Sequence, residues 1–370
     1  MEAVIFLFFL KLFIFQRTTK EKMNGTSLNE SFKCEKDNRV TAVVFPCLYS
    51  ILFIVALVLN SMAAWVFFKI PNNSTFVVYL KNVVVADLLM TLTIPVKILS
   101  DAGVGQLRTF YCRYSAVLFY ITMYISILLL GLISLDRYLK IVRPFGKCVL
   151  QRVCVGQLLC AAVWVLMLCL ALPNVILSNK EPRILGNKLK CSSMKSEAGL
   201  YWHERFNYFC QVVFFGTLAL MVVCYTFISK KVYESYKASK SKSQAARRRT
   251  KAKVFVVVGV FVICFAPFHM ARVPYTLTQT RDLRIDCHAK NALYIAKETT
   301  LWLSATNVCL DPLIYVFLCK VFRKRLTNTI CKATLESPTA TSTQMQMLPI
   351  NHTSTLSHNG VSQLPSEHSE

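Results

Sequence analysis

Residues 112–138 read CRYSAVLFYITMYISILLLGLISLDRY, and this stretch decides the fold. As an α-helix at about 1.5 Å per residue it runs about 40 Å, more than the ~30 Å hydrocarbon core of a membrane. Its polar positions, such as Ser126, are scattered through an apolar rod, so we expect it to be buried among other helices. The stretch has a thiol, Cys112, at one end and the charged motif Asp136-Arg137-Tyr138 at the other. We expect each of these ends to interact with a residue elsewhere in the chain.

The composition of the whole chain is that of a membrane protein. Of its 370 residues 54% are hydrophobic, and the mean hydropathy is +0.45, which excludes an ordinary soluble globular protein. In lipid, the backbone groups of long apolar segments can be satisfied only as helices. Such segments lie at about 42–68, 76–99, 110–138, 153–177, 204–229, 253–277 and 291–318. We therefore predict an all-α membrane protein, with a seven-transmembrane helix bundle over residues 42–318.

Positive charge gathers in alternate connections between these segments. Residues 230–253 hold ten Lys or Arg against one Glu, and 139–152 and 320–332 are also basic. By the positive-inside rule these connections are cytoplasmic, which places the N-terminus outside the cell. The formal net charge of +24 is therefore explained by topology. Nucleic-acid binding by ARRRTKAK (246–253) is set aside, because loop charge beside a membrane helix is far commoner.

The N-terminal residues 1–41 are predicted to form an extracellular tail with glycosylation acceptors at Asn24 and Asn29. Within this tail, residues 3–15 are an apolar run that Lys11 interrupts. A cleaved signal, a membrane-dipping tail and untranslated sequence ahead of a start at Met23 are the alternatives for residues 1–22, and the last is favoured.

The C-terminal part of the chain divides into two predicted segments. Residues 319–332 set apolar side chains against basic ones, so they should form an amphipathic helix along the lipid of the inner membrane surface. Cys331 there is either a lipidation site or an idle thiol. Residues 333–370 are rich in Ser and Thr and poor in apolar residues, which predicts a disordered, phosphorylatable cytoplasmic tail.

Polar residues within the apolar segments should face the bundle interior. Asn60 is expected to make an interhelical hydrogen bond. A wet polar cluster that could hold a hydrated cation, most simply sodium, is predicted from Asp87, Ser126, Asn307 and Asp311. Four cysteines fall in predicted extracellular territory, and an even number in an oxidising compartment suggests two disulfides. They are Cys34, Cys112, Cys191 and Cys287.

Taken in order, these features resemble those of the rhodopsin-like G-protein-coupled receptors. The likeness spans residues 40–332 and rests on Asn60, Asp87, the Cys112/Cys191 pair, Asp136-Arg137-Tyr138, Trp164, CFAPFH (264–269) and Asn307…Asp311-Pro312…Tyr315. More narrowly, YLKNVVVADLLMTLTIP (79–95) and KETTLWLSATNVCLDPLIY (297–315) are similar to the metabotropic purinoceptors that bind nucleotides, above all their Gi-coupled ADP-receptor subgroup. Three positions depart from the wider family: Leu59 replaces the usual Gly, helix five lacks its Pro, and Phe265 replaces a common Trp. The ADP subgroup shares the last two.

The resemblance implies a set of roles. It implies disulfides from Cys112 to Cys191 and from Cys34 to Cys287, and a plasma-membrane receptor that is no enzyme. Its partners would be ADP, a heterotrimeric Gi-type protein, and receptor kinases and arrestin at the C-terminal tail. The switch toward the G protein would comprise Asp136, Arg137, Tyr138, Asn307, Asp311, Pro312 and Tyr315. Asp136 would hold Arg137 in the resting state.

Two cations lie near the outer end of the predicted bundle. Arg272 is 19 residues beyond Lys253, and Lys297 is 18 residues before Tyr315, which places both about 27–28 Å up their helices. Residues that share a helical face with one another are Arg272, Tyr275 and Gln279, then Tyr120 and Tyr124, then His203 and Asn207. Together they predict a cup with cationic walls and aromatic sides, which suits an anion that carries a flat ring.

The residues alone leave alternatives open for this cup. Lys297 could pair with Glu298, and both cations could extend to lipid headgroups. The resemblance favours a ligand site, because it implies phosphate and base contacts from Arg108, Tyr120, Lys195, His203, Asn207, Arg272, Tyr275, Gln279 and Lys297. Ala171 departs from a Ser in a close relative, which puts a base contact from that side in doubt.

Other function classes fit less well. A light-sensing opsin needs a lysine deep in helix seven, where this chain has Ala305. An enzyme would need a reactive pair within the bundle, and the chain has no HExxH or GxSxG. Among receptors, the alternative ligands are a UDP-sugar, as in a neighbouring subgroup, and a lysophospholipid.

Overall fold

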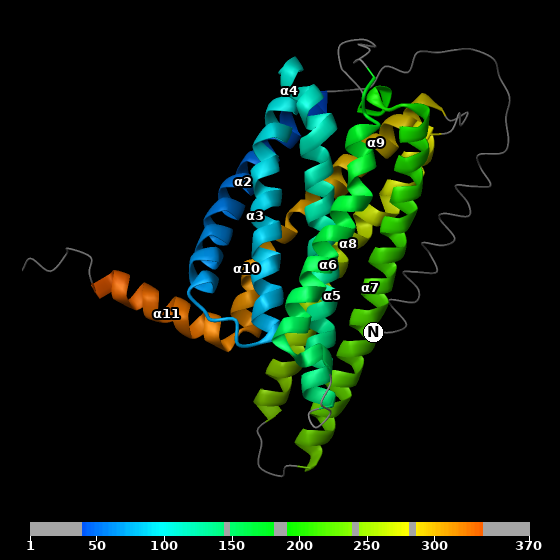
Figure 1. Ribbon diagram of the computed structural model, residues 1–370. Helices are drawn as coiled ribbons and strands as arrows, with labels where there is room; N and C mark the ends of the chain where they lie inside the picture. The colour runs from blue at the N-terminus through cyan, green and yellow to red at the C-terminus, as the bar shows by residue number, and fades with distance from the viewer. Residues whose placement is uncertain (1–38, 144–148, 181–190, 239–243, 281–285, 336–370) are drawn as a thin grey trace, which may run out of the picture. The chain divides into compact units, whose positions relative to one another are not determined.

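The computed structural model describes residues 39–143, 149–180, 191–238, 244–280 and 286–335. In these ranges every regular element is helical (Figure 1). The long helices are α2 (Arg39–Phe68), α3 (Thr75–Asp101), α5 (Ala116–Val142), α6 (Val153–Ile176), α7 (Glu197–Ala238), α8 (Gln244–Thr280), α9 (Cys287–Ala305) and α10 (Asn307–Leu318). The shorter ones are α4 (Gly105–Phe110), the π-helical η1 (Tyr111–Ser115), the 3-10 turns η2 (Val149–Gln151) and η3 (Cys191–Met194), and α11 (Lys320–Leu335). One compact unit ends at Thr327, within α11.

The predicted seven-helix membrane bundle is confirmed. Six of the described helices are long and apolar enough to cross a membrane, and the α9–α10 rod is a seventh when it is taken with the start of α11, from which it is bent by 92°. The outward faces of α2 and α6 carry exposed apolar side chains, for example Ile54 on α2 and Leu158 on α6. Such faces are stable only against lipid, because water would penalise that much apolar surface.

Helix α5, which holds most of the stretch quoted first, is buried among other helices as predicted. It contacts α3, α6 and α7, and Ile125, Ile127 and Leu129 are fully buried along it. The π-helical turn η1 precedes it and presents Cys112 toward η3. The disulfide thus marks one end of α5 and Asp136 marks the other, and these two ends of the bundle are called the disulfide end and the Asp136 end.

Pro312 lies inside α10 and does not break that helix. The break in the rod falls earlier, at Thr306 between α9 and α10. A proline has no N–H to give to the carbonyl four residues before it, which here is that of Val308. Asn60 Nδ2 of α2 donates to this carbonyl at 2.7 Å, so the predicted interhelical hydrogen bond of Asn60 is confirmed. Because the orphaned acceptor is satisfied from α2, α10 stays helical through the proline.

The amphipathic segment predicted at 319–332 is helical as α11. Phe322 is buried and stacks on Phe67 with ring centroids 4.7 Å apart, whereas Val321 and Arg323 are exposed. The side chain of Cys331 lies outside the described part, as do Asn24, Asn29 and the tail after residue 335. Their predicted modifications and the predicted disorder stay predictions.

Candidate functional site

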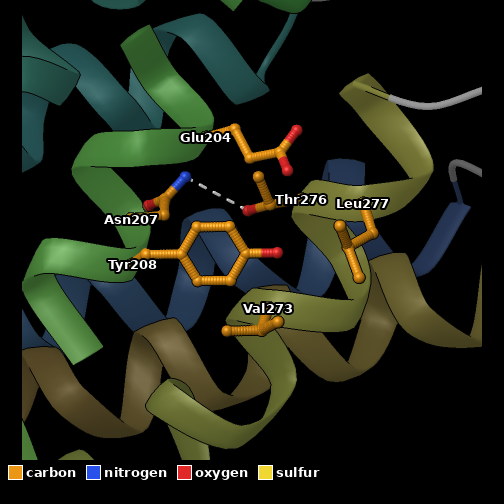
Figure 2. Close-up of a pocket in the computed structure, with 6 residues that line it drawn as sticks. All are labelled: Glu204, Asn207, Tyr208, Val273, Thr276 and Leu277. Carbon is orange, nitrogen blue, oxygen red and sulfur yellow. Dashed lines mark hydrogen bonds between the residues drawn. The ribbon is translucent and has the colours of Figure 1, made fainter. Parts of the chain in front are cut away.

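A shallow pocket between α7 and α8 lies beside the predicted cup. It has an empty volume of about 160 Å³ and is lined by Glu204, Asn207, Tyr208, Val273, Thr276 and Leu277 (Figure 2). This space is open to solvent and encloses no cavity, so the pocket cannot hold a nucleotide as it stands. Its inner wall leads to the cup, because Asn207 donates to the Thr276 hydroxyl at 3.2 Å and also accepts from Arg272.

Arg272 is the central cation of the cup. Its Nε donates to Asn207 Oδ1 at 3.1 Å and its Nη1 to the Tyr120 hydroxyl at 3.3 Å, with the guanidinium carbon 4.7 Å from the centre of the Tyr120 ring. The residue is only 6% exposed, which rules out the headgroup alternative for it. Within the described part of the chain it has no carboxylate partner. All of its contacts there are therefore with neutral groups.

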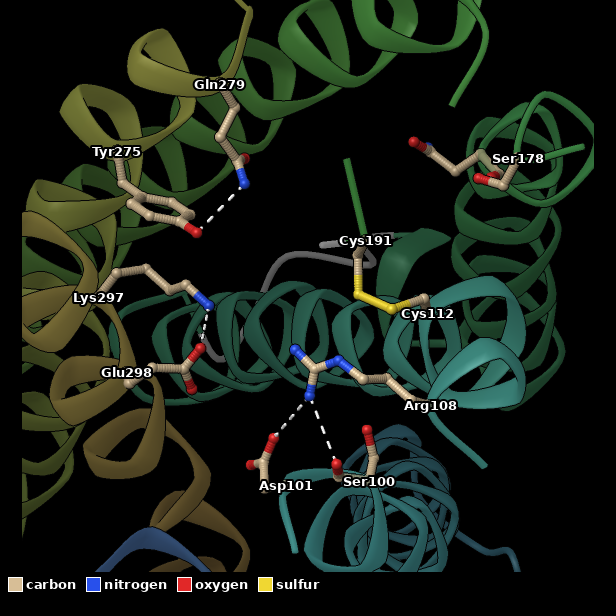
Figure 3. Close-up of a disulfide and its surroundings, with 11 residues drawn as sticks. Ser100, Asp101, Arg108, Cys112, Ser178, Cys191, Tyr275, Gln279, Lys297 and Glu298 are labelled. Carbon is tan, nitrogen blue, oxygen red and sulfur yellow. Dashed lines mark hydrogen bonds and ion pairs between the residues drawn. A yellow bond between two sulfur atoms is a disulfide. The ribbon is translucent and has the colours of Figure 1, made fainter. Parts of the chain in front are cut away.

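Lys297, unlike Arg272, has a carboxylate partner. It pairs with Glu298, which was one of the alternatives that the sequence left open. Its Nζ lies 2.5 Å from Glu298 Oε1, and the second carboxylate oxygen lies 3.2 Å from Lys97 of α3 (Lys297 and Glu298 are labelled in Figure 3). Lys97 in turn pairs with Asp101 at 3.0 Å, and Asp101 lies 3.7 Å from Arg108. Five charged side chains from α3, α4 and α9 thus form one chain of ion pairs, called here the charge chain.

The charge chain contains three residues that the sequence analysis did not place at the site. Glu298 was considered only as an alternative partner of Lys297, and Lys97 and Asp101 were overlooked. The sequence could have predicted the pair of Lys97 and Asp101. Lys97 lies in an apolar segment with Asp101 four residues later, and a buried lysine in a membrane helix needs a carboxylate. The contact of Lys97 with Glu298 of α9 could not be predicted from this spacing, because the two residues lie on different helices.

Several of the aromatic residues predicted for the cup lie beside its cations. Gln279 donates to the Tyr275 hydroxyl at 3.2 Å, and Lys297 Nζ lies 5.1 Å from the centre of the Tyr275 ring. Tyr120 stacks on Phe268 at 6.1 Å. Tyr124, however, lies one turn deeper, buried against the edge of His269 at 5.6 Å. It lies on the same face of α5 as Tyr120, as the spacing predicted, and its contact with a ligand stays a prediction.

Lys195 and His203 close the cup from the side of η3 and α7. Lys195 Nζ donates to Asn174 Oδ1 of α6 at 3.1 Å. Its burial, and then the positive charge of Arg272, lower the pKa of Lys195 to about 8. His203 is half-buried on α7, where the charges of Arg272, Lys195 and Lys297 all act on it. The cup therefore gathers positive charge that its own carboxylates do not fully offset.

The disulfide that covers this end is the predicted one. Cys112 of η1 is bonded to Cys191 of η3, with Cα atoms 5.2 Å apart (Figure 3). Met194 is fully buried against it, which fixes η3 and the neighbouring Lys195 over the bundle. Cys287 is also disulfide-bonded, but Cys34 lies outside the described residues, so the pairing of these two stays a prediction.

At the Asp136 end, Arg137 Nη2 donates to Asp136 Oδ2 at 2.7 Å, as predicted. Lys140 lies 2.8 Å from the other oxygen of Asp136, which also accepts from the Thr75 hydroxyl. The Tyr138 ring packs against Phe227 of α7 at 5.9 Å. The motif therefore ties α5 to the start of α3 and to α7.

Between the two ends lies the predicted polar cluster. Asp87 accepts from Ser126 at 3.4 Å and from the Tyr315 hydroxyl at 3.1 Å, and Asn307 donates to Asp311 at 2.7 Å. Asn307 Oδ1 and Asp311 Oδ1 are buried without a hydrogen-bond partner in the described part of the chain. Small hard cations prefer carboxylate, carbonyl and hydroxyl oxygens, so this donor set fits a sodium ion.

Comparison with known proteins shows the family of this chain. A family model described as 7 transmembrane receptor (rhodopsin family) matches residues 59–315. The chain belongs to the rhodopsin family of seven-transmembrane receptors. It is 50% identical to the human purinoceptor 13 over 85% of its own length and 90% of that protein. It is 43% identical to the bovine purinoceptor 14 over 82% and 90%, and 43% identical to the mouse G-protein coupled receptor 87 over 82% and 84%.

These matches confirm the resemblance to the purinoceptors. The chain is a multi-pass membrane receptor and not an enzyme, because the proteins it matches over most of their length are receptors. In this receptor the disulfide end holds the cup and the charge chain, and the opposite end holds the Asp136 cluster. These two charged sites lie at opposite ends of α5.

Proposed function

We propose that this receptor binds an extracellular nucleotide, ADP, at the cup and passes the signal to a Gi-type G protein. The observation that carries the proposal is Arg272, a buried guanidinium with no carboxylate partner in the described part of the chain. Burying a charge without a counter-charge is costly, and a phosphate group would remove that cost. The planar fork of arginine also matches two phosphate oxygens at once.

The surroundings of Arg272 support a nucleotide over a bare phosphate. Tyr120 and Tyr275 offer aromatic faces beside the cations, and such faces suit a flat base. The relatives named purinoceptors favour a purine as that base. Lys195 and His203 would face the phosphates from η3 and α7, and Arg108 would do so from α4.

Lys297 would join the phosphate only by giving up part of its ion pair with Glu298. Lys97 holds the second oxygen of that carboxylate, so Glu298 would keep a cation when Lys297 turns to the ligand. The charge chain would in this way make the positive charge of Lys297 available to the ligand. Arg272 needs no such exchange, and it should therefore contribute the largest share of phosphate recognition.

At the Asp136 end, Arg137 would be released from Asp136 toward the G protein when ADP binds. A few kcal/mol of differential affinity between the two states suffices for such a switch. The Asp136 end would be cytoplasmic and the cup extracellular, in the plasma membrane, with receptor kinases and arrestin acting on the tail. A sodium ion held by Asp87, Ser126, Asn307 and Asp311 would supply positive charge between these ends.

The direct test is displacement of a radiolabelled nucleotide from membranes of transfected cells by ADP, UDP-glucose and a lysophospholipid. The proposal expects ADP to displace at the lowest concentration. Stronger displacement by UDP-glucose would make the chain a UDP-sugar receptor, and stronger displacement by the lysophospholipid would refute a nucleotide. Coupling is tested by ligand-stimulated nucleotide exchange on purified heterotrimers of the inhibitory, stimulatory and phospholipase-linked classes, where only the first should respond strongly.

A further inference from the structure

The carboxylate of Asp136 is held by two cations, one on each oxygen. Arg137 Nη2 lies 2.7 Å from Oδ2 and Lys140 Nζ lies 2.8 Å from Oδ1, while the side chain of Asp136 is only 3% exposed. The predicted switch used only the first of these contacts. A buried carboxylate that loses one of two cations still keeps a counter-charge, whereas one that loses its sole cation is left unpaired.

The two cations are anchored in different ways. The Arg137 guanidinium rests on the Phe76 ring, with 3.7 Å to its centre, and within the described residues it donates only to Asp136. Lys140 Nζ also donates to the Thr75 hydroxyl at 2.8 Å and lies 3.4 Å from the Ser74 hydroxyl. A movement of Arg137 breaks the contact at Oδ2 and leaves the contacts at Oδ1 intact.

We propose that Lys140 is a standby counter-ion, which keeps Asp136 neutralised after Arg137 has left it. Lys140 is then a positioning residue that acts through Asp136 and lowers the cost of unlocking the switch. This inference rests on the proposed release of Arg137 toward the G protein. It does not depend on which ligand the cup binds.

The sign of the effect separates this role from that of a second lock. Without Lys140, release of Arg137 would leave a buried carboxylate with no cation, which is strongly unfavourable. In the resting state, loss of Lys140 would make Arg137 the sole cation paired with Asp136 and would strengthen that ion pair. Both consequences favour the resting state, so removal of Lys140 should lower signalling. Removal of a lock would raise it.

The experiment measures ligand-free nucleotide exchange on a purified heterotrimer by membranes that hold the full-length chain at matched expression. Lys140→Met keeps the length of the side chain and removes its charge. Exchange should fall at least roughly tenfold, equivalent to about 1.4 kcal/mol. Lys140→Arg should restore most of it. The matched control is Lys231→Met, which removes an exposed lysine from α7. It should leave exchange within about twofold of the unmodified chain, because substitutions of exposed residues usually have small effects.

A second background identifies the mechanism. Asp136→Asn removes the charge that Lys140 is proposed to neutralise, so Lys140→Met should have little effect in the Asp136→Asn chain. The same loss in both backgrounds would mean that Lys140 touches the G protein directly, and a rise in exchange would mean that it is a second lock. Either result overturns the proposal. Because no ligand is added, a failure of ADP to bind would refute the proposed ligand and leave this inference standing.

Discussion

Replacing Arg272 by alanine removes the central cation of the cup, which has no carboxylate partner in the described part of the chain. The guanidinium is buried at the level of Tyr120 and Asn207, where it makes two hydrogen bonds to neutral groups. If ADP binds here, its phosphate gains charge-assisted hydrogen bonds that alanine cannot make. Arg272→Ala should therefore weaken ADP binding more than any other single change in the cup.

The size of the effect follows from the burial of the guanidinium. A hydrogen bond to a charged group contributes about 1.5–3 kcal/mol, which corresponds to a loss of roughly 10- to 150-fold in affinity. Arg272→Lys should recover only part of the loss, because a point charge cannot present two parallel donors. Arg272→Ala also leaves the buried Asn207 Oδ1 without its donor, because the remaining bond to Thr276 is made by Asn207 Nδ2. The free energy of unfolding should therefore fall by about 1–3 kcal/mol.

The assay is displacement of labelled nucleotide by ADP at matched surface expression. Arg205→Ala is the matched control, because Arg205 is an exposed arginine on the neighbouring helix α7 whose guanidinium lies 5.0 Å from the Tyr201 ring. It removes the same charge without touching the cup. If Arg272→Ala binds ADP as tightly as Arg205→Ala does, Arg272 does not meet phosphate and the nucleotide proposal loses its physical basis.

Three further changes test other parts of the structure. Glu298→Gln should tighten ADP binding about three- to tenfold, because it removes the negative charge that holds Lys297; weaker binding would show that Glu298 contacts the ligand. Burial and a neighbouring arginine lower the pKa of Lys195 to about 8, so its positive charge is half lost at that pH and is lost progressively as the pH rises further. ADP affinity measured between pH 7 and 9 should fall above pH 8, by at most roughly tenfold per pH unit, and Lys195→Gln should flatten the profile. Asn60→Ala should lower the melting temperature in detergent, at a cost of about 1–3 kcal/mol, and less so in a Pro312→Ala chain, where the backbone supplies the missing donor.

The fold could be predicted from the sequence because the membrane imposes a strong rule. Apolar runs of sufficient length must be helices in lipid, and all seven predicted segments are helical in the structure. The ends of the helices were harder to predict. α7 begins at Glu197 and ends at Ala238, well beyond the predicted 204–229, because hydropathy marks only the part of a helix that lipid covers. The polar turns outside it follow ordinary helix propensity.

The arrangement of the cup residues was predictable where one helix supplies neighbouring residues. Spacing alone placed Arg272, Tyr275 and Gln279 on one face of α8, and the structure keeps the contact between the last two. Contacts between helices depend on how each helix is rotated, which periodicity does not give. Periodicity placed Tyr120 and Tyr124 on one face of α5, for example, but it could not show that Tyr124, one turn deeper, would contact His269 of α8.

The balance of charge in the cup shows why its lysines and arginines are not equivalent. Lys97, Lys297 and Arg108 share two carboxylates in the charge chain, so most of their charge is already matched. Arg272 and Lys195 have no carboxylate partner in the described part of the chain, and these two share one neighbourhood. An anionic ligand gains most from the cations that nothing else neutralises. Its phosphate should therefore settle between Arg272 and Lys195 first, and Lys297 should contribute only as far as Lys97 can hold Glu298 alone.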